Sequence, residues 1–279
     1  MESIASESTQ PLVSVVIPAY NEERRLPHTL QRVNAYLAAQ NYPSEILVVD
    51  DGSTDGTTRV VETFAQQHPT VRLLKNDHRG KGYTVRTGML AAHGHIVLFS
   101  DADLSTPIEE LEKLMPWFER GYEIVIGSRE GVGAQRIKEP FYRHIMGRAF
   151  NFVVQLLTVR GIQDTQCGFK AFRDDVAQDI FSRMLLYGDN AKQVSGGMVT
   201  AFDVEALFIG HKAGYRIKEV PVQWRYGTET KVNPLKDSYR NFCDVVRVRW
   251  NDVRGLYNLP HTSRPRDASS PAPKRVQSK

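Results

Sequence analysis

The sequence has few cysteines and no long apolar run, and both absences limit what the chain can be. Only two of its 279 residues are cysteines, Cys167 and Cys243, and their spacing fits no zinc-binding pair. The N-terminus lacks the pattern of a signal peptide, which predicts two free thiols in a reducing cytosol. No stretch approaches the roughly 18 consecutive apolar residues that span a bilayer, which argues against an integral membrane protein.

The chain also lacks a strong charge imbalance outside its C-terminus. The formal net charge is +4, and the segment after Pro260 alone carries five basic residues against one acid, so the rest is near neutral. No nucleic-acid partner is therefore predicted, because such domains carry a basic face. Residues 1–11 and the basic tail 260–279 are predicted to be disordered. The tail is either a plain solvated terminus or a weak contact with anionic lipid.

Two common nucleotide motifs are missing as well, namely the P-loop and the Gly-x-Gly-x-x-Gly of dinucleotide folds. Short apolar runs instead alternate with amphipathic stretches, which predicts an α/β fold with a mostly parallel central sheet flanked by helices. Ligands of such folds bind beyond the carboxyl ends of the strands. The predicted strands are 13–17, 45–49, 71–74, 96–99 and 123–126, and the predicted helices are 24–40, 57–68, 81–92 and 108–120.

The second half of the chain is less regular. A glycine-rich, basic stretch predicts a mobile loop over residues 128–140, and a further loop is expected at 227–233. Residues 165–172 are expected to return irregularly to a short strand. The remaining predicted elements are helices at 141–160, 203–213 and 235–257 and a strand at 217–226.

Two carboxylates stand one residue apart directly after the apolar run 96–99. Asp101 and Asp103 can converge on one hard divalent cation, since such a cation prefers oxygen ligands and can bridge protein carboxylates to substrate phosphates. Taken alone, the pair also fits an acidic turn without metal. Three further motifs at predicted strand ends or helix starts favour the metal interpretation, because nucleotides bind at that edge of the sheet.

The first motif runs from Pro18 to Glu22, where the proline is expected to stop the strand ladder and the turn can present Glu22 to a base or ribose. The second contains Asp51, whose carboxylate can accept from a base imino group or a ribose hydroxyl. In the third, Lys81 stands between two glycines before a helix, where it can supply charge to a diphosphate. The first two have structural alternatives, a plain strand-to-helix connection and an N-cap cluster.

In this order the motifs resemble the inverting family 2 glycosyltransferases with a GT-A fold. They are Pro-Ala-Tyr-Asn-Glu from residue 18, Asp-Asp-Gly-Ser-Thr-Asp-Gly from 50, Gly-Lys-Gly from 80 and Asp-Ala-Asp from 101. Further motifs downstream resemble those of the polyprenyl-phosphate sugar transferases. They are Ile-Gly-Ser-Arg from 126, Phe-Tyr-Arg from 141, Asp-Thr-Gln-Cys-Gly-Phe-Lys from 164, Asp-Val-Glu from 203 and Glu-Val-Pro-Val from 219. Cys-Gly-Phe-Lys and the closing Arg-Trp-Asn-Asp most resemble dolichyl-phosphate β-glucosyltransferases.

This resemblance, which covers about residues 12–258, implies a UDP-sugar donor, in the first place UDP-glucose, and a polyprenyl phosphate acceptor. Asp101 and Asp103 would hold Mg²⁺ or Mn²⁺ on the diphosphate, beside Lys81. Arg129 and Arg143 would hold the acceptor phosphate. The nucleotide would be held by Pro18, Ala19, Tyr20, Glu22 and Asp51.

One position departs from the family pattern. Related mannosyltransferases carry a glutamine metal ligand two residues after the second aspartate, whereas this chain has Ser105. The departure implies that metal coordination relies more on Asp103 and on water.

The acceptor decides whether a general base is required. The second pKa of a phosphate monoester is near 6, so such an acceptor is largely dianionic at neutral pH and needs positioning, which an arginine fork supplies. A hydroxyl acceptor would need a base, for which Asp164 is the best candidate; its alternative role is to fix the loop before Gly168. The candidate catalytic residues are Asp101, Asp103, Arg129 and Asp164.

The predicted helix 235–257 is amphipathic. Its apolar side chains follow three- and four-residue spacing on one stripe, formed by Leu235, Tyr239, Phe242, Val246, Trp250, Val253 and Tyr257. Basic side chains fall on an adjacent flank, formed by Lys236, Arg240, Arg247 and Arg254. The helix either docks on the domain with a solvated basic edge or lies on an anionic lipid surface.

The sequence thus predicts one GT-A domain at 12–259, with a nucleotide-sugar-binding part (12–127), an acceptor part (128–233) and the C-terminal amphipathic helix (235–257). A metal-dependent hexosyltransferase is expected in the cytoplasm, peripheral on the cytoplasmic face of the membrane. One rival is a transferase that uses another nucleotide-diphosphate hexose or a soluble hydroxyl acceptor. A rival of another class is a nucleotide-sugar-binding module without catalysis, against which the intact aspartate pair and Arg129 argue.

Overall fold

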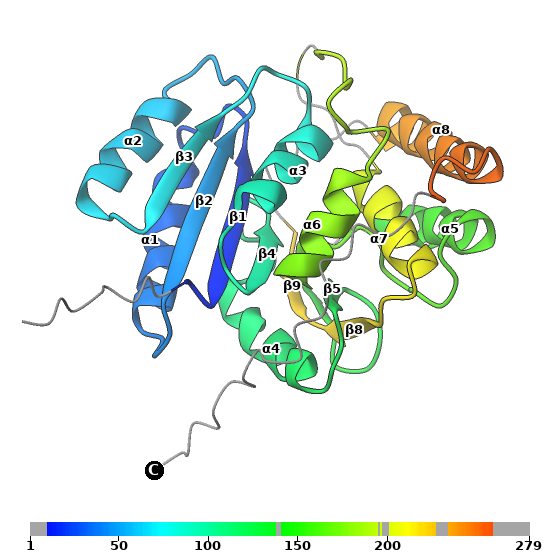
Figure 1. Ribbon diagram of the computed structural model, residues 1–279, viewed down its shortest axis with the longest axis horizontal. Coiled ribbons are helices and arrows are strands. Elements are labelled where there is room, and N and C mark those ends of the chain that lie inside the picture. Colours follow the sequence, from blue (N-terminus) through cyan, green and yellow to red (C-terminus); the bar gives the residue numbers. More distant parts are fainter. Residues whose placement is uncertain (1–9, 138–140, 195, 197–200, 227–233, 259–279) are drawn as a thin grey trace, which may run out of the picture.

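A seven-stranded sheet forms the centre of the computed structural model, which describes residues 10–258 apart from 138–140, 195, 197–200 and 227–233 (Figure 1). The strand order is β3-β2-β1-β4-β7-β5-β8, and every neighbouring pair is parallel except those that β7 makes with β4 and β5. Its strands are β1 (Val13–Ala19), β2 (Ser44–Asp50), β3 (Val71–Lys75), β4 (Ile96–Ser100), β5 (Ile124–Ser128), β7 (Phe169–Arg173) and β8 (Ile217–Pro221).

Helices cover both faces of this sheet (Figure 1). One face packs against α1, α2 and α4, and the other packs against α3, α6 and α7. The mostly parallel, helix-flanked sheet predicted from the apolar runs is therefore confirmed. The helices are α1 (Leu26–Ala38), α2 (Thr57–Gln67), α3 (Lys81–Ala91), the 3₁₀ turn η1 (Ile108–Glu110), α4 (Leu111–Glu119), α5 (Phe141–Leu157), α6 (Asp174–Ser182), α7 (Phe202–Lys212) and α8 (Pro234–Val253).

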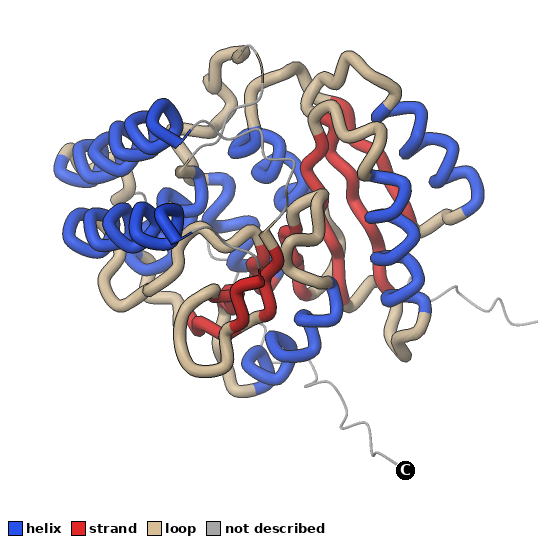
Figure 2. Tube along the Cα trace, turned by 180° about the vertical axis from the view of Figure 1, so that it is seen from behind, coloured by secondary structure: helices blue, strands red, loops and turns tan. Residues whose placement is uncertain are grey.

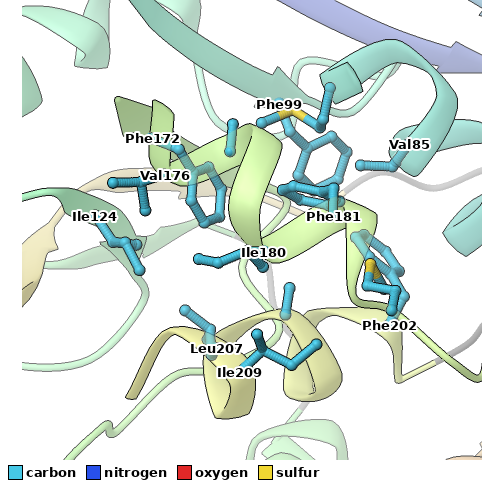
Figure 3. Packing of buried hydrophobic residues seen from close by; sticks show 14 of the residues in the cluster. Val85, Phe99, Ile124, Phe172, Val176, Ile180, Phe181, Phe202, Leu207 and Ile209 are labelled. Carbon is cyan, nitrogen blue, oxygen red and sulfur yellow. The ribbon is translucent and has the colours of Figure 1, made fainter. Parts of the chain in front are cut away.

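The strands are buried on both sides because successive side chains point to opposite faces. In β4, Val97 and Phe99 join the cluster under α3, α6 and α7, while Leu98 joins the cluster under α1 and α4. Figure 3 shows the first cluster, where aromatic rings from strands and helices meet edge to face. The rings of Phe172 in β7 and Phe181 in α6 are 5.4 Å apart. This packing fixes the strand ends at which the motifs lie.

Three details differ from the sequence-based expectation. Helix α6 was not predicted, although it packs directly on the sheet. The expected loop 128–140 contains a short strand, β6 (Gln135–Ile137), which pairs with β9 (Gln223–Arg225); residues 138–140 and the expected loop 227–233 lie outside the described residues. The single strand expected at 217–226 is broken after Pro221, which ends β8 because a proline cannot donate to the ladder.

The expectation that Pro18 stops the ladder was wrong. Strand β1 continues through Pro18 to Ala19, which pairs with Asp50 of β2. On the other side of β1, the pairing with β4 ends at Val16. A proline is tolerated here because the missing N–H faces a side of the strand on which the neighbour has already ended.

Helices α5 and α8 lie side by side at one end of the molecule (Figures 1 and 2). Helix α8 docks on the domain through Asn241, Asp244, Val245 and Val248, which are buried. The predicted apolar stripe instead faces solvent, except for the buried Tyr257 and for Leu235, whose side chain lies outside the described residues. We use the name α5–α8 apolar face for the exposed apolar residues that these two neighbouring helices carry: Phe152, Leu156, Tyr239, Phe242, Val246, Trp250 and Val253.

No helix within the described part of the chain is both long enough and apolar enough to cross a bilayer.

Candidate active site

The motifs of the first half meet at the carboxyl edge of the sheet. The register pairs Ala19 of β1 with Asp50 of β2, so that Tyr20 and Asp51 leave the sheet next to each other. The Asp51 N–H donates to the Ala19 carbonyl over 2.8 Å. Asp101 directly follows β4, the other neighbour of β1. The sheet thus brings together residues that are up to 81 positions apart in the sequence, from Tyr20 to Asp101.

Asp51 is almost completely buried and organises the turn before α3. Its carboxylate accepts from the backbone N–H groups of Arg79, over 2.9 Å, and Gly80, over 3.0 Å. It also accepts from Nδ1 of His78 over 2.8 Å. Gly80 adopts a φ of 89°, which glycine tolerates and residues with a Cβ rarely adopt. The carboxylate and the glycine therefore fix where α3 begins.

His78 is a site residue that the sequence analysis missed. Its ring lies parallel to that of Tyr20, with centroids 3.9 Å apart and an interplanar angle of 3°. Its Nε2 lies 3.1 Å from the carbonyl oxygen of Gly196, which belongs to the segment between α6 and α7. No periodicity marks this histidine, and the available signal was its position two residues before Gly80.

Lys81 and Asp101 form the charged centre of this edge. The Lys81 ammonium lies 2.6 Å from Oδ1 of Asp101 and 5.3 Å from the centre of the Phe99 ring. Burial lowers the pKa of Lys81, but the carboxylates of Asp101 and Asp203 outweigh it and raise that pKa. Burial raises the pKa of Asp101, and the Lys81 ammonium opposes this rise.

Gly168 lies against the Asp101 carboxylate and leaves no room for a side chain. The N–H of Asp101 donates to the Gly168 carbonyl over 3.1 Å. A Cβ on Gly168 would come within 2.0 Å of Oδ2 of Asp101. This close approach explains the glycine of the Cys-Gly-Phe-Lys sequence, because any side chain there would displace the carboxylate.

Asp103 is exposed beside Asp101, and its Oδ1 accepts from the backbone N–H of Ser105 over 2.9 Å. Among the described residues no cluster of three or more His, Cys, Asp or Glu side chains is placed to hold a metal. The protein therefore offers two neighbouring carboxylates. This set fits Mg²⁺ or Mn²⁺, because such ions are often held by one or two carboxylates together with substrate phosphates and water.

A buried ion pair lies beneath the carboxyl edge of the sheet. Lys170 of β7 is 1% exposed, and its ammonium lies 2.5 Å from Oδ1 of Asp203 at the start of α7. The same ammonium donates to the carbonyl of Cys167. The pair thus ties the loop before β7 to α7. Both residues stood in the motifs found in the sequence, but no role had been given to either.

A second cluster lies where β5 ends. Arg129 grips Asp164 with two parallel hydrogen bonds, from Nε and from Nη2, each 2.8 Å long. Its backbone N–H donates to the same carboxylate, and its guanidinium lies 5.2 Å from the centre of the Trp224 ring. Burial alone would raise the pKa of Asp164, but the Arg129 guanidinium outweighs it and holds that pKa well below its usual range.

The loop 164–168 connects the two clusters. Asp164 faces Arg129 at one end of it, while Gly168 contacts Asp101 at the other. Glu219 of β8 fixes the loop by accepting from the backbone N–H groups of Gln163 and Asp164, both over 2.8 Å. The Arg129–Asp164 contact joins residues far apart in sequence, so no local pattern predicted it.

The remaining predicted site residues lie at the edge of the first cluster or outside the described side chains. Pro18 and Ala19 end β1. The backbone N–H of Glu22 donates to Oγ1 of Thr57 over 2.8 Å, and its carboxylate lies 3.3 Å from Arg25. Arg143 lies on α5, but its side chain is outside the described residues.

Several known proteins resemble this chain in sequence. Residues 14–181 match the model of the family described as glycosyl transferase family 2. The dolichyl-phosphate β-glucosyltransferase of Dictyostelium discoideum is 34% identical over 88% of this chain and 76% of its own length. The human protein of the same name is 32% identical over 94% of this chain and 82% of its own length.

A solved structure shares the arrangement of the elements. Glucosyl-3-phosphoglycerate synthase from Mycobacterium tuberculosis, in complex with Mn²⁺, UDP-glucose and phosphoglyceric acid, matches with a TM-score of 0.59 at 16% identity. The match covers 90% of this chain and 82% of that one. The fold is the GT-A fold expected from the order of the motifs. The chain belongs to glycosyl transferase family 2.

Proposed function

We propose that this protein transfers glucose from UDP-glucose to a polyprenyl phosphate of the dolichyl type and forms a β-linked lipid-phosphate sugar. The observation that carries the proposal is the contact of Gly168 with Asp101. This contact joins the charged edge suited to a nucleotide diphosphate to the loop that holds Arg129 beside Asp164. The names of the relatives, dolichyl-phosphate β-glucosyltransferases, support glucose as the transferred sugar and a dolichyl-type lipid phosphate as the acceptor.

The donor would bind at the carboxyl edge of β1, β2 and β4. Tyr20 offers a flat ring for the base, and Asp51 offers a carboxylate that accepts from a base N–H. Pro18, Ala19 and Glu22 would shape the rest of the nucleoside site. Lys81, which starts α3, would meet the diphosphate together with the N-terminus of that helix, where backbone N–H groups favour anions.

Asp101 and Asp103 would hold Mg²⁺ or Mn²⁺ at the diphosphate. When bound, the metal would neutralise the charge that builds on the departing UDP, as a Lewis acid does. The Lys81 ammonium lies 2.6 Å from Asp101, so it would also stay close to the negative charge that builds on the departing UDP. Ser105 supplies only a backbone N–H to Asp103, which fits the prediction that Asp103 and water carry much of the coordination.

The acceptor phosphate would be positioned by Arg129 and Arg143. A phosphate dianion is already a nucleophile at neutral pH, so the reaction needs alignment more than a base. An attack in line, from the face opposite the departing diphosphate, turns an α-linked donor into a β-linked product. The lowered pKa of Asp164 makes it a weak base. Its two bonds to Arg129 favour the alternative role of fixing the loop and the arginine.

The α5–α8 apolar face would bring the enzyme to the lipid. An acceptor with a long prenyl tail stays in the bilayer, because the transfer of each methylene group from the bilayer into water costs about 0.8 kcal/mol of free energy. Large exposed apolar patches on a protein mark interaction sites, and arginines border this one. Arg247 on α8 and Arg254, directly after this helix, are exposed, whereas the side chain of Lys236 lies outside the described residues. A peripheral position on the cytoplasmic face of the membrane is therefore part of the proposal.

The test is transfer of label from UDP-[¹⁴C]glucose into an organic phase that contains dolichyl phosphate. We expect label in the lipid with Mn²⁺ or Mg²⁺ and none with EDTA. Asp103→Asn should abolish transfer without unfolding the protein, because the side chain is exposed and keeps its volume. Ser105→Ala is the matched control, since its hydroxyl has no part in the proposal.

The arginines can be separated from the donor site in the same assay. Arg129→Lys keeps a charge beside Asp164 but loses the fork, and it should reduce transfer to the lipid while UDP-glucose affinity stays near normal. Transfer by the wild type to a soluble hydroxyl acceptor but not to lipid phosphate would favour the rival transferase. Binding of UDP-glucose without any turnover would favour a non-catalytic module.

A further inference from the structure

His78 makes, inside the protein, contacts that a nucleobase would make in the proposed donor site. Its ring stacks on Tyr20 at 3.9 Å with an interplanar angle of 3°. Its Nδ1 donates to Oδ2 of Asp51 over 2.8 Å. Stacking on an aromatic ring and donation to a carboxylate are the two interactions that the donor proposal assigns to the base, so this inference rests on that proposed function.

The Asp51 carboxylate has little capacity to accept a hydrogen bond from a second ring while that of His78 is in place. Two carboxylate oxygens offer about four acceptor positions, and the residue is only 3% exposed. Oδ1 accepts from the N–H groups of Arg79, over 2.9 Å, and Gly80, over 3.3 Å. Oδ2 accepts from Gly80 over 3.0 Å as well as from His78. A base N–H that binds this carboxylate would therefore take the place of the imidazole.

We infer that the His78 ring occupies the base subsite of the ligand-free protein and leaves it when a uridine nucleotide binds. Uracil is planar and carries an N–H between two carbonyl groups, so it can stack on Tyr20 and donate to Asp51 as the imidazole does. Cytosine has an acceptor at the same ring position and leaves the carboxylate without that donor. His78 is thus a specificity-determining residue, because a base must restore both contacts that it displaces.

The exchange also reaches a second segment. Nε2 of His78 lies 3.1 Å from the carbonyl oxygen of Gly196, and the His78 carbonyl accepts from the N–H of Val194 over 3.0 Å. Arg79, the next residue, donates to the carbonyl of Asp189 over 2.9 Å. Displacement of the ring from Tyr20 removes the contact with Gly196, while the backbone contact with Val194 and the Arg79 contact with Asp189 do not involve the ring.

The test compares the affinity for UDP of the wild type and of His78→Ala by calorimetry in Mn²⁺, with inorganic pyrophosphate as a probe without a base. If the ring fills the subsite in about nine of ten molecules, its removal tightens UDP binding about ten-fold, because the apparent affinity scales with the fraction of open sites. Pyrophosphate affinity should stay unchanged. Unchanged or weaker UDP binding by His78→Ala would overturn the inference.

Two further variants and one spectrum sharpen the result. His78→Phe keeps a flat ring without a donor to Asp51, so its UDP affinity should lie between those of the wild type and His78→Ala. Tyr20→Ala is the matched control, since it removes the stacking partner and should weaken UDP but spare pyrophosphate. In the wild type, the His78 Cε1–H resonance, assigned by its absence from His78→Ala, should shift on addition of UDP.

A His78 resonance that stays in place at saturating UDP would overturn the inference without any variant. A wild type that binds no UDP at all would instead remove the proposed function and this inference with it. The two failures are therefore distinguishable.

Discussion

Removal of two aromatic side chains from the α5–α8 apolar face should release the protein from lipid without unfolding it. The double variant Phe152→Ser/Trp250→Ser changes one residue on each helix. These side chains are 69% and 62% exposed, respectively, so they add little to the packing of the domain. Substitutions at such exposed positions usually change the free energy of unfolding by within about 0.5 kcal/mol. A loss of vesicle binding by this variant would therefore report on the surface and not on the fold.

The expected size of the effect follows from the exposed area. An aromatic side chain presents about 150–250 Å², so these exposed fractions leave roughly 100–150 Å² of each ring in water. Complete removal from water at about 25 cal/mol per Å² is worth roughly 2.5–4 kcal/mol per ring. Insertion at the depth of the headgroups gains about half of that. The pair then contributes about 2.5–4 kcal/mol, which corresponds to roughly 60- to 700-fold in the partition constant.

The assay is sedimentation with vesicles of phosphatidylcholine and phosphatidylserine at several lipid concentrations. Leu185→Ser is the matched control, because Leu185 is also an exposed apolar residue but lies outside the face, and its binding should equal that of the wild type. Thermal unfolding of all three proteins checks the fold. A wild type that does not sediment with vesicles, or a double variant that binds as well as the wild type, would refute the reasoning and make α8 purely structural.

Three further predictions concern buried groups. Burial raises the pKa of Cys167 to about 11, so at pH 8 iodoacetamide should modify Cys243 well before Cys167, as followed by mass spectrometry. Burial also raises the pKa of Glu205; its protonated form is therefore favoured in the folded state, and in urea unfolding the wild type should lose stability relative to Glu205→Gln as the pH rises above about 4.3, the unfolded pKa, towards the folded pKa. Asp164→Asn should lower the free energy of unfolding at pH 7 by about 2–4 kcal/mol, because it leaves the Arg129 charge unpaired. Since the folded pKa of Asp164 is lowered, this difference should persist above about pH 4, the unfolded pKa, and disappear as the pH falls through the folded value.

The first half of the fold was predictable because its signal is local. Each strand from β1 to β5 is a short apolar run, and the helices between them show the spacing of amphipathic helices. Both patterns can be recognised in the sequence without knowledge of the tertiary contacts. Helix α6 was missed for a related reason. It begins at Asp174, immediately after β7 ends at Arg173, and no turn residue separates the two patterns.

The site divides in the same way. Asp51, Lys81 and Asp101 could be predicted as candidates because they follow predicted strand ends or start a predicted helix, and the register of β1, β2 and β4 brings these elements together. The bond between Arg129 and Asp164 depends on how β5 and the loop before β7 meet, which no local pattern contains.

The apolar stripe of α8 shows a second limit. Helical spacing identified which side chains share a face, but the same spacing fits a face that docks on a domain and a face that meets solvent. The structure distinguishes them, because the side that docks carries Asn241 and Asp244 while Trp250 stays exposed. Polar residues with buried partners, such as Asp244 with Tyr187, made the docked side look like the solvated one in the sequence.

The antiparallel β7 has a consequence for how the chain can be synthesised. It is the strand that fills the space between β4 and β5, yet about seventy residues separate its start at Phe169 from the end of β4 at Ser100. At about 5–20 residues per second, the ribosome leaves β4 without this neighbour for roughly 4–14 s. During that time β4 and then β5 present unpaired apolar edges, which are templates for pairing with other chains. The nascent protein thus passes through an interval in which these edges are open to pairing with other chains, and this interval ends only after the residues that build the loop at the candidate site have emerged.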